Sequence, residues 1–200
     1  MAKITLDTTS HLEVFETPWA PGPRDNRGKN LTITYGWHNI ADMGDVMIAA
    51  TPRGICFTGF TVDGKRMRAE NRLHDYFPAA DISKDADATA PYAAGIKTQY
   101  QTNKDVSSPL PLDLYGTPFQ LLVWRALLNI PFGKTASYQD IARTIGHDTA
   151  ARAVGGAVGD NPISILVPCH RVIQSNGSIT NYGWGTPKKR TLLNMEGVAA

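Results

Sequence analysis

The chain has 200 residues, of which 42% are hydrophobic and 19% charged, and its formal net charge is +2. These proportions are ordinary for a globular protein of one or two small domains, and no apolar run approaches the roughly 20 residues that span a bilayer. The first residues lack the apolar segment of a signal peptide, and two cysteines without a CxxC or HxxxH pattern indicate neither a disulfide framework nor a zinc site. We therefore expect a cytoplasmic protein with reduced thiols, no membrane partner, no metal and no other cofactor.

The two ends of the chain differ in charge. Residues 117–200 contain eight basic and four acidic side chains, which gives that half a charge of +4 and leaves −2 for residues 1–116. This asymmetry permits a polyanionic partner for the C-terminal half, although it is too mild to identify one.

The N-terminal half predicts a small α+β domain. Proline, glycine and charge gather in "TPWAPGPRDNRGKN", so residues 1–30 are expected to be a loose or extended lead-in. Alternating, β-branched segments follow at 31–37 and 45–64 and predict antiparallel strands. A helix is expected over residues 65–77. We assign residues 31–115 to this domain. The apolar face of its helix is expected to hold four side chains: Met67, Leu73, Tyr76 and Phe77.

The C-terminal half, residues 116–200, predicts a mainly helical domain. Thr117 to Gln120 has the pattern of a capping box with proline at the first helical position, and Ser137 to Asp140 is a second capping box. A third helix is expected over residues 149–160. Two short helices around a glycine turn indicate a winged helix-turn-helix-like unit. The first helix is expected to bury six side chains: Phe119, Leu122, Val123, Ala126, Leu127 and Ile130.

The third helix of this half is unusually rich in small residues, among them Ala151 and Gly155, and Arg152 is its one long polar side chain. A base-reading helix normally presents several arginine, asparagine or glutamine side chains. Two interpretations therefore remain: tight packing of another helix, or shape-based contact with a nucleic-acid groove into which one side chain is inserted.

Cys169 follows the apolar run "ISILV" at 163–167, which predicts a buried strand that ends at Pro168. A lone cysteine is often a small core residue, but His170 supplies a base and Arg171 an anchor, so the thiol is also a candidate nucleophile. Neighbouring residues of a strand point to opposite faces, so the chain must turn here, or a water must bridge the two side chains.

Glu196 is the candidate for the group that orients His170. It lies four residues after Leu192 on the last helix and projects from the apolar face, where a carboxylate is costly unless it is paired. The alternative is a glutamate at the helix end that turns outward to water.

The stretch "PCHRVI" at 168–173, with Asn161-Pro162 upstream, resembles the active-site signature of the O6-alkylguanine-DNA alkyltransferases, also called methylated-DNA–protein-cysteine methyltransferases. The resemblance covers most of residues 116–197, and "VMIAATPRGICFTGF" and "YFPAA" are similar to the N-terminal domain of the family. The bacterial adaptive-response branch is the most similar, although we expect this chain to be too short for its regulatory domain.

The resemblance implies a reaction centre. Cys169 would accept the alkyl group, and His170 would act through a water with Glu196 behind it. Tyr138 corresponds to the tyrosine that assists guanine as a leaving group and helps to turn the nucleotide. The main-chain carbonyls of Cys169 and Val172 would read the guanine amino group.

The resemblance also implies DNA contacts. Arg152 corresponds to the arginine that fills the space of the extruded base, and Ala151 and Gly155 lie on the same DNA-binding helix. Asn161 corresponds to a hinge between that helix and the cysteine loop. Two features depart from the family pattern: Ser164 replaces a proline, and the pocket-closing loop of Tyr182, Gly183 and Trp184 carries a tryptophan, which is expected to change which bulky adducts fit.

The function implied is direct DNA repair by a monomer. The protein would transfer the alkyl group from O6-alkylguanine in double-stranded DNA, with O4-alkylthymine as a second candidate lesion, irreversibly to its own cysteine after base flipping, once per molecule. The alternatives are a helix-turn-helix regulator without catalysis, a cysteine hydrolase with many turnovers, and a damage-binding relative without an acceptor cysteine, against which Cys169 counts.

Overall fold

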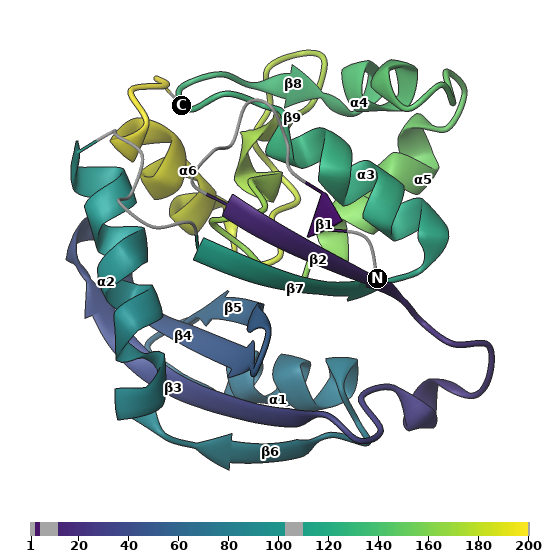
Figure 1. Ribbon diagram of the computed structural model, residues 1–200. Helices are drawn as coiled ribbons and strands as arrows, with labels where there is room; N and C mark the ends of the chain where they lie inside the picture. The colour runs from purple at the N-terminus through teal and green to yellow at the C-terminus, as the bar shows by residue number, and fades with distance from the viewer. Residues whose placement is uncertain (1–2, 5–11, 103–109, 200) are drawn as a thin grey trace.

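The computed structural model describes residues 3–4, 12–102 and 110–199 (Figure 1). Within these residues the chain forms a seven-stranded sheet with the order β1-β2-β7-β5-β4-β3-β6. The strands are β1 (Lys3–Ile4), β2 (Leu12–Pro18), β3 (Thr32–Ile40), β4 (Gly44–Thr51), β5 (Gly54–Phe60), β6 (Asp81–Lys84) and β7 (Leu110–Gly116).

The sheet is mixed, which corrects the expectation of an antiparallel sheet. Strands β3, β4 and β5 are antiparallel as predicted, but β7 runs parallel to both β2 and β5, and β6 runs parallel to β3. Helices α1 (Met67–Tyr76) and α2 (Ala86–Thr102) lie in the connections that lead to β6 and β7. Such long connections allow parallel pairing, and the alternation of side chains does not reveal them.

The expected loose lead-in is wrong for residues 12–18. This segment is strand β2, which pairs with β7 along its whole length and buries Leu12 and Val14. Trp19 then stacks on Tyr115, with 5.3 Å between the ring centroids. The rest of the lead-in includes residues 1–2 and 5–11, which lie outside the described residues.

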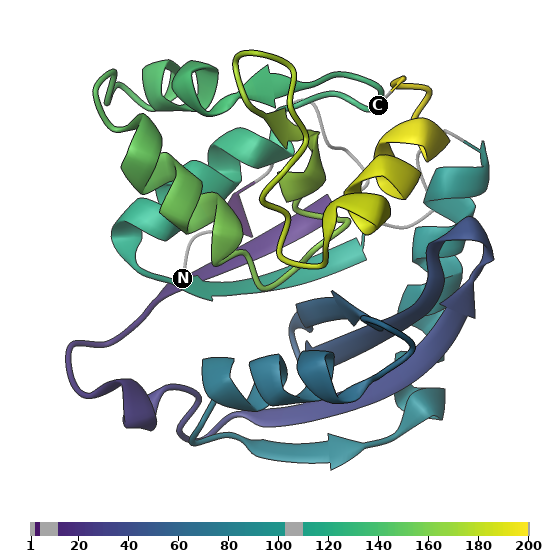
Figure 2. The same cartoon turned by 180° about the vertical axis from the view of Figure 1, so that it is seen from behind.

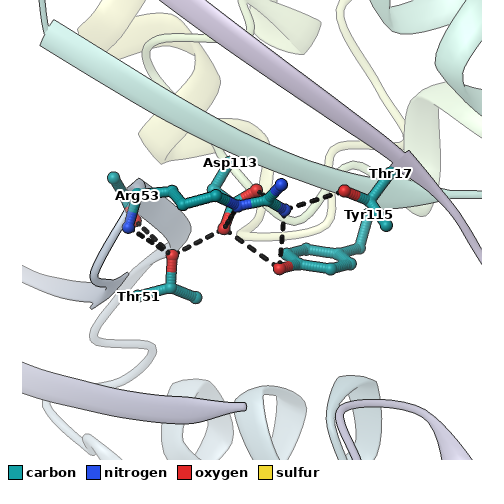
Figure 3. Close-up of polar contacts among 6 residues, drawn as sticks. Thr17, Thr51, Arg53, Asp113 and Tyr115 are labelled. Carbon is teal, nitrogen blue, oxygen red and sulfur yellow. Dashed lines mark hydrogen bonds and ion pairs between the residues drawn. The ribbon is translucent and has the colours of Figure 1, made fainter. Parts of the chain in front are cut away.

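A polar cluster fixes the β4–β5 turn against β7 and β2 (Figure 3). Arg53 forms an ion pair with the fully buried Asp113, with 2.5 Å between Nη2 and Oδ1, and the same guanidinium nitrogen donates to Thr17 and Tyr115. Thr51 donates to the second oxygen of Asp113 at 2.5 Å. Every group of the cluster has a partner, as buried polar groups require.

The C-terminal half contains helices α3 (Pro118–Leu128), α4 (Tyr138–Thr144), α5 (Ala151–Gly159) and α6 (Thr186–Met195), with a short parallel pair of strands, β8 (Ala136–Ser137) and β9 (Val172–Ile173). Both predicted capping boxes are present, at Thr117 and Ser137. Helices α4 and α5, with the turn between them, form the predicted helix-turn-helix unit. The α+β fold class is therefore confirmed.

Helix α3 is buried more widely than its apolar pattern predicts. Phe119 and Leu122 are only partly buried, whereas Leu121 and Trp124 lie in the core. Trp124 donates its indole N–H to the carbonyl of Ala157 at 2.8 Å and so joins α3 to α5. This bond holds the helix-turn-helix unit against the rest of the molecule.

Leu73 of α1 and Phe77, which follows the helix, are buried as predicted and Tyr76 is partly buried, but Met67 is 66% exposed. None of the described helices is long and apolar enough to cross a membrane.

The chain passes from β7 to α3 at the predicted boundary near Gly116. Contacts cross this boundary, since Arg125 pairs with Glu16 and β5 bonds to the loop after α5, so the division into two domains remains a prediction.

Candidate active site

The apolar run before Cys169 is a buried loop, which corrects the predicted strand. Ile163 makes one isolated bridge to Thr58 of β5, the next residues turn, and Ile165 has a φ of +76°. A β-branched residue in this left-handed region is strained and persists only where its surroundings fix it. The side chains are buried as in a strand, which is why the sequence pattern misleads.

Asn161 fixes this loop. Its side-chain amide donates to the carbonyl of Val167 at 2.8 Å and its carbonyl oxygen accepts from the N–H of Ile163 at 3.0 Å. Thr58 adds a hydrogen bond of 2.5 Å to the carbonyl of Ser164. The loop that leads to the cysteine is thus held from within and from the N-terminal sheet.

Cys169 begins a 3-10 turn, Cys169–Arg171, and all three of its side chains are buried. The turn that the sequence required between cysteine and histidine is therefore present. The thiol lines a small cavity of about 20 Å³, which has room for one water molecule. The cavity is also lined by Tyr138 of α4, Gly155 and Gly159 of α5, and residues 181–184.

His170 and Arg171 converge on Glu196, which lies just after α6. His170 Nε2 is 2.7 Å from Glu196 Oε1, and Arg171 donates to both carboxylate oxygens, at 2.8 and 3.0 Å. Tyr100 of α2 donates to Oε1 at 3.0 Å. The carboxylate is buried and paired, so the interpretation of Glu196 as a group turned outward to water is wrong.

The pKa values of Glu196 and His170 differ from those of free side chains. Burial alone would raise the pKa of Glu196, but hydrogen bonds and charges of His170 and Arg171 lower it to about 2. Burial lowers the pKa of His170 more than Glu196 raises it. At neutral pH the carboxylate is charged and the imidazole is neutral.

A neutral imidazole that donates from Nε2 to Glu196 keeps Nδ1 as an acceptor. Nδ1 is buried and has no hydrogen-bond partner among the described residues. Burial raises the pKa of the Cys169 thiol, and the nearby amide of Asn161 and charge of Lys189 offset only part of this. The thiol is therefore protonated at rest and needs a base, and the neighbouring histidine has a free basic nitrogen.

Helix α5 presents Gly156 and Gly159 to the outside. A Cβ atom added to Gly156 or Gly159 would meet nothing within 4 Å, and one added to Gly155 would meet only Tyr138, at ordinary contact distance. Arg152 is exposed at the start of the helix. Within the described residues no other helix packs tightly against these glycines, so the interpretation as a tight helix-packing surface is wrong for this side of α5.

Trp184 is 5% exposed and fixes the loop that borders the cavity. Its indole N–H donates to Ser164 at 2.7 Å, and its ring contacts Phe57 and Phe60 edge-on. A Cβ on Gly59 of β5 would lie 2.8 Å from this ring, so glycine is needed there. The two positions at which the sequence departs from the family pattern, Ser164 and Trp184, are therefore bonded to each other.

Sequence reasoning missed three side chains at the site. Lys189 is 1% exposed and donates to the carbonyl of Val172 at 2.6 Å, so the carbonyl predicted to read guanine already has a partner. Tyr100 reaches Glu196, and Arg72 of α1 lines the cavity. Arg72 and Tyr100 come from the N-terminal half, and their spacing from Cys169 gave no sign of proximity. Lys189 could have been suspected from its place on the apolar side of α6.

The described residues contain no group of three or more histidine, cysteine or acidic side chains that could hold a metal ion. The site is built from a thiol, an imidazole, a carboxylate and hydroxyl groups, so the chemistry that these residues themselves support is proton transfer and nucleophilic attack.

Residues 118–198 match the family described as "6-O-methylguanine DNA methyltransferase, DNA binding domain". The chain is 43% identical over 153 residues to an inducible methylated-DNA–protein-cysteine methyltransferase of Bacillus subtilis, covering 74% of this chain and 82% of that protein. It is 37% identical to the bifunctional transcriptional activator/DNA repair enzyme Ada of Escherichia coli, covering 84% of this chain but 47% of that protein. Among solved structures, Mycobacterium tuberculosis OGT in complex with DNA matches with a TM-score of 0.67 and 35% identity, covering 84% of this chain and 96% of that one.

Proposed function

Because the chain belongs to the family of methylated-DNA–protein-cysteine methyltransferases, whose work is DNA repair by alkyl transfer to a cysteine, we propose that Cys169 is its alkyl acceptor. The observation that carries this assignment is that the Cys169 thiol lines a small cavity, while the next residue, His170, contacts Glu196 through Nε2 and keeps a buried Nδ1 without a hydrogen-bond partner among the described residues. In the regulator alternative the thiol is inert, and an inert thiol in a core needs neither a cavity nor a neighbouring base.

The reaction proceeds by displacement. His170 Nδ1 takes the thiol proton through one water, and Glu196 stabilises the imidazolium that results. The thiolate then attacks the alkyl carbon, so that an S–C bond forms while the bond between that carbon and guanine O6 breaks. Tyr138, whose pKa is raised by burial and by Cys169, remains protonated and supplies a proton to the departing guanine. The product is a thioether, so each molecule acts once.

DNA is the partner, and its lesion is O6-alkylguanine in a duplex, with O4-alkylthymine as a second candidate. A base inside a duplex is out of reach of a buried thiol and has to be extruded into the cavity. The smooth outer side of α5, with Ala151, Gly155 and Arg152, lies against the groove, and Arg152 occupies the space that the base leaves. We further propose that the protein acts as a cytoplasmic monomer.

The experiment that tests the function is incubation with duplex DNA that carries O6-methylguanine, followed by measurement of the intact protein mass. A gain of one CH2 per molecule, without further turnover, supports alkyl transfer. Repeated turnover without a change in mass would support a cysteine hydrolase instead.

Arg152→Ala is expected to weaken repair of duplex DNA far more than reaction with free O6-methylguanine. Its side chain is exposed on a helix that is otherwise smooth, so the fold does not need it. Rates of alkyl transfer to Cys169 from both substrates check this. Lys84→Ala, on the exposed edge strand β6, is the charge-matched control. Equal losses on both substrates would remove Arg152 from the role of base replacement.

Trp184→Ala is expected to raise the rate with O6-benzylguanine in DNA relative to O6-methylguanine. The cavity of about 20 Å³ is too small for a purine, so the loop of residues 181–184 has to move outward when a base enters. The contacts of Trp184 with Ser164 and Phe57 resist that movement. The ratio of the two rates is the readout, because it is insensitive to partial loss of stability. A ratio that stays constant would show that Trp184 does not select the adduct.

A further inference from the structure

Two arginines of the N-terminal helix α1 reach both sides of the cavity that holds Cys169. Arg68 donates from Nη2 to the carbonyl of Gly183 at 2.9 Å, on the loop that borders the cavity. Arg72 donates to the carbonyl of Gly159 at 3.5 Å, at the end of α5, and its guanidinium lies 4.5 Å from the centre of the Trp184 ring. Figure 2 shows α1 running below both of these segments.

Gly183 makes room for one of these side chains. A Cβ atom at this position would lie 2.9 Å from Nη1 of Arg72. The guanidinium of Arg72 therefore occupies a gap between the loop and α5, and it is part of the cavity lining together with Tyr138 and Asn161. It is one of the groups that an extruded nucleotide would meet.

Neither arginine has an acidic partner within ion-pair distance among the described residues. Arg66, just before the same helix, does, since it lies 2.8 Å from Asp45. Arg72 is partly buried, so its charge is partly removed from water, and this burial lowers its pKa. Asp160 influences Arg72 only weakly, and it accepts a hydrogen bond from Gln120. A partly desolvated guanidinium that bonds only to carbonyl oxygens is a site that an anion would complete.

The geometry of base extrusion determines which anion fits. When a base enters the cavity, its sugar and the adjoining phosphates remain at the mouth, where α5, the loop 181–184 and α1 meet. Guanidinium groups bind phosphate oxygens through paired N–H donors. Arg68 and Arg72 are four residues apart and therefore lie on one face of α1, so the face turned toward the mouth is basic.

We propose that Arg68 and Arg72 bind the backbone phosphates next to the extruded nucleotide, so that the N-terminal half takes part directly in DNA recognition. This inference rests on the proposed function, because it assumes that the base enters the cavity. It adds a phosphate-binding surface on α1 to the surface that α5 supplies.

The test is the salt dependence of binding to duplex DNA that carries O6-methylguanine, measured with Cys169→Ser as the common background. The slope of log K against log salt is negative, and each lost phosphate contact lowers its magnitude by about 0.9. Arg68→Gln and Arg72→Gln are each expected to show this decrease, and the double variant their sum. Arg66→Gln is the matched control beside the same helix, and its slope is expected to stay unchanged. Unchanged slopes in the Arg68 and Arg72 variants would overturn the proposal.

Arg72→Lys separates phosphate binding from support of Trp184. Lysine keeps the charge, so phosphate binding predicts a slope like that of the parent, whereas lysine cannot replace the planar guanidinium over the ring. If Arg72→Lys and Arg72→Gln lower affinity equally with no change in slope, the residue only holds the loop. Arg68 is exposed, so its variant tests the proposal even where Arg72 variants lose stability.

A second arm distinguishes failure of this inference from failure of the proposed function. With Cys169 intact, Arg68→Gln is expected to react with the free base O6-methylguanine at the rate of the unmodified protein, since this substrate has no phosphate and Arg68 does not line the cavity. If the unmodified protein transfers no alkyl group to Cys169 from DNA, the proposed function fails, whatever the salt slopes show. If it does transfer and the slopes are unchanged, only the role of α1 fails.

Discussion

Cys169→Ser is expected to abolish alkyl transfer while DNA that carries O6-methylguanine is still bound. Serine preserves the shape of the side chain within the 3-10 turn, but its hydroxyl is far less acidic than a thiol, and the neutral His170 cannot generate an alkoxide from it at neutral pH. The measurements are the intact mass after reaction and peptide mapping. The unmodified protein is expected to gain one CH2, on the peptide that contains residue 169.

Cys56→Ala provides the control. Cys56 is fully buried in β5, its thiol donates to the carbonyl of Ala49 at 3.5 Å, and burial raises its pKa well above the usual range. The carboxylate of Asp113 raises the pKa of this thiol further and is paired with Arg53, so replacement of Cys56 is expected to leave the stoichiometry of transfer at one. Alkyl label on Cys56, or label on the Cys169→Ser protein, would contradict the assignment of the acceptor.

Glu196→Gln is expected to cause the largest loss of stability among these substitutions. The carboxylate is buried and bonded to His170, Arg171 and Tyr100, so its replacement leaves the guanidinium of Arg171 buried without a counter-charge. Breaking a buried ion pair in this way costs about 3–5 kcal/mol. Thermal unfolding at pH 7 is the measurement. Glu16→Gln, which removes a carboxylate from the partly exposed pair with Arg125, is the control and is expected to cost much less.

The buried pairing of Glu196 also predicts how the stability of the protein depends on pH. The pKa of Glu196 falls from an ordinary value of 4.5 to about 2 on folding, which corresponds to roughly 3 kcal/mol at neutral pH. Because the folded pKa is the lower one, this stabilisation is complete above about pH 4.5 and is lost as the pH falls toward 2. Glu196→Gln should therefore lose most of its disadvantage in acid. A stability difference that persists unchanged at pH 2 would contradict the pairing.

Glu196→Gln should also slow alkyl transfer and move its pH optimum upward. The carboxylate favours the charged form of His170, so without it the thiol gives up its proton only at higher pH. The pH–rate profile with the free base is the readout, because it does not depend on DNA binding. A slower reaction with an unmoved profile would assign Glu196 a purely structural role.

The local parts of this fold could be predicted from the sequence. The capping boxes at Thr117 and Ser137 determine where α3 and α4 begin, because the bonds that they describe lie within four residues. The pattern around Cys169 likewise indicated the candidate reactive centre, and the place of Glu196 on an apolar helix face indicated a partner for its carboxylate, which is His170.

The non-local parts of the fold could not be predicted from the sequence. Strands β6 and β7 run parallel to their neighbours because of connections through helices, and the loop before Cys169 is apolar enough to imitate a strand. Arg72 and Tyr100 are far from Cys169 in sequence, and only the folding of the sheet brings their side chains to the site. Long-range polar contacts of this kind leave no periodic pattern in a single sequence.

The contacts that cross from β5, α1 and α2 to the cysteine loop limit how the chain can be divided. A cut after Gly116 separates two halves that look independent in the sequence, yet the C-terminal fragment would lose Thr58, Tyr100 and Arg72, which hold the loop, Glu196 and the cavity edge. Reactivity of Cys169 would then depend on reassembly of the two fragments. Fused to two other proteins, the fragments would form a split reporter, in which a permanent covalent label on one cysteine records that the fused proteins have met.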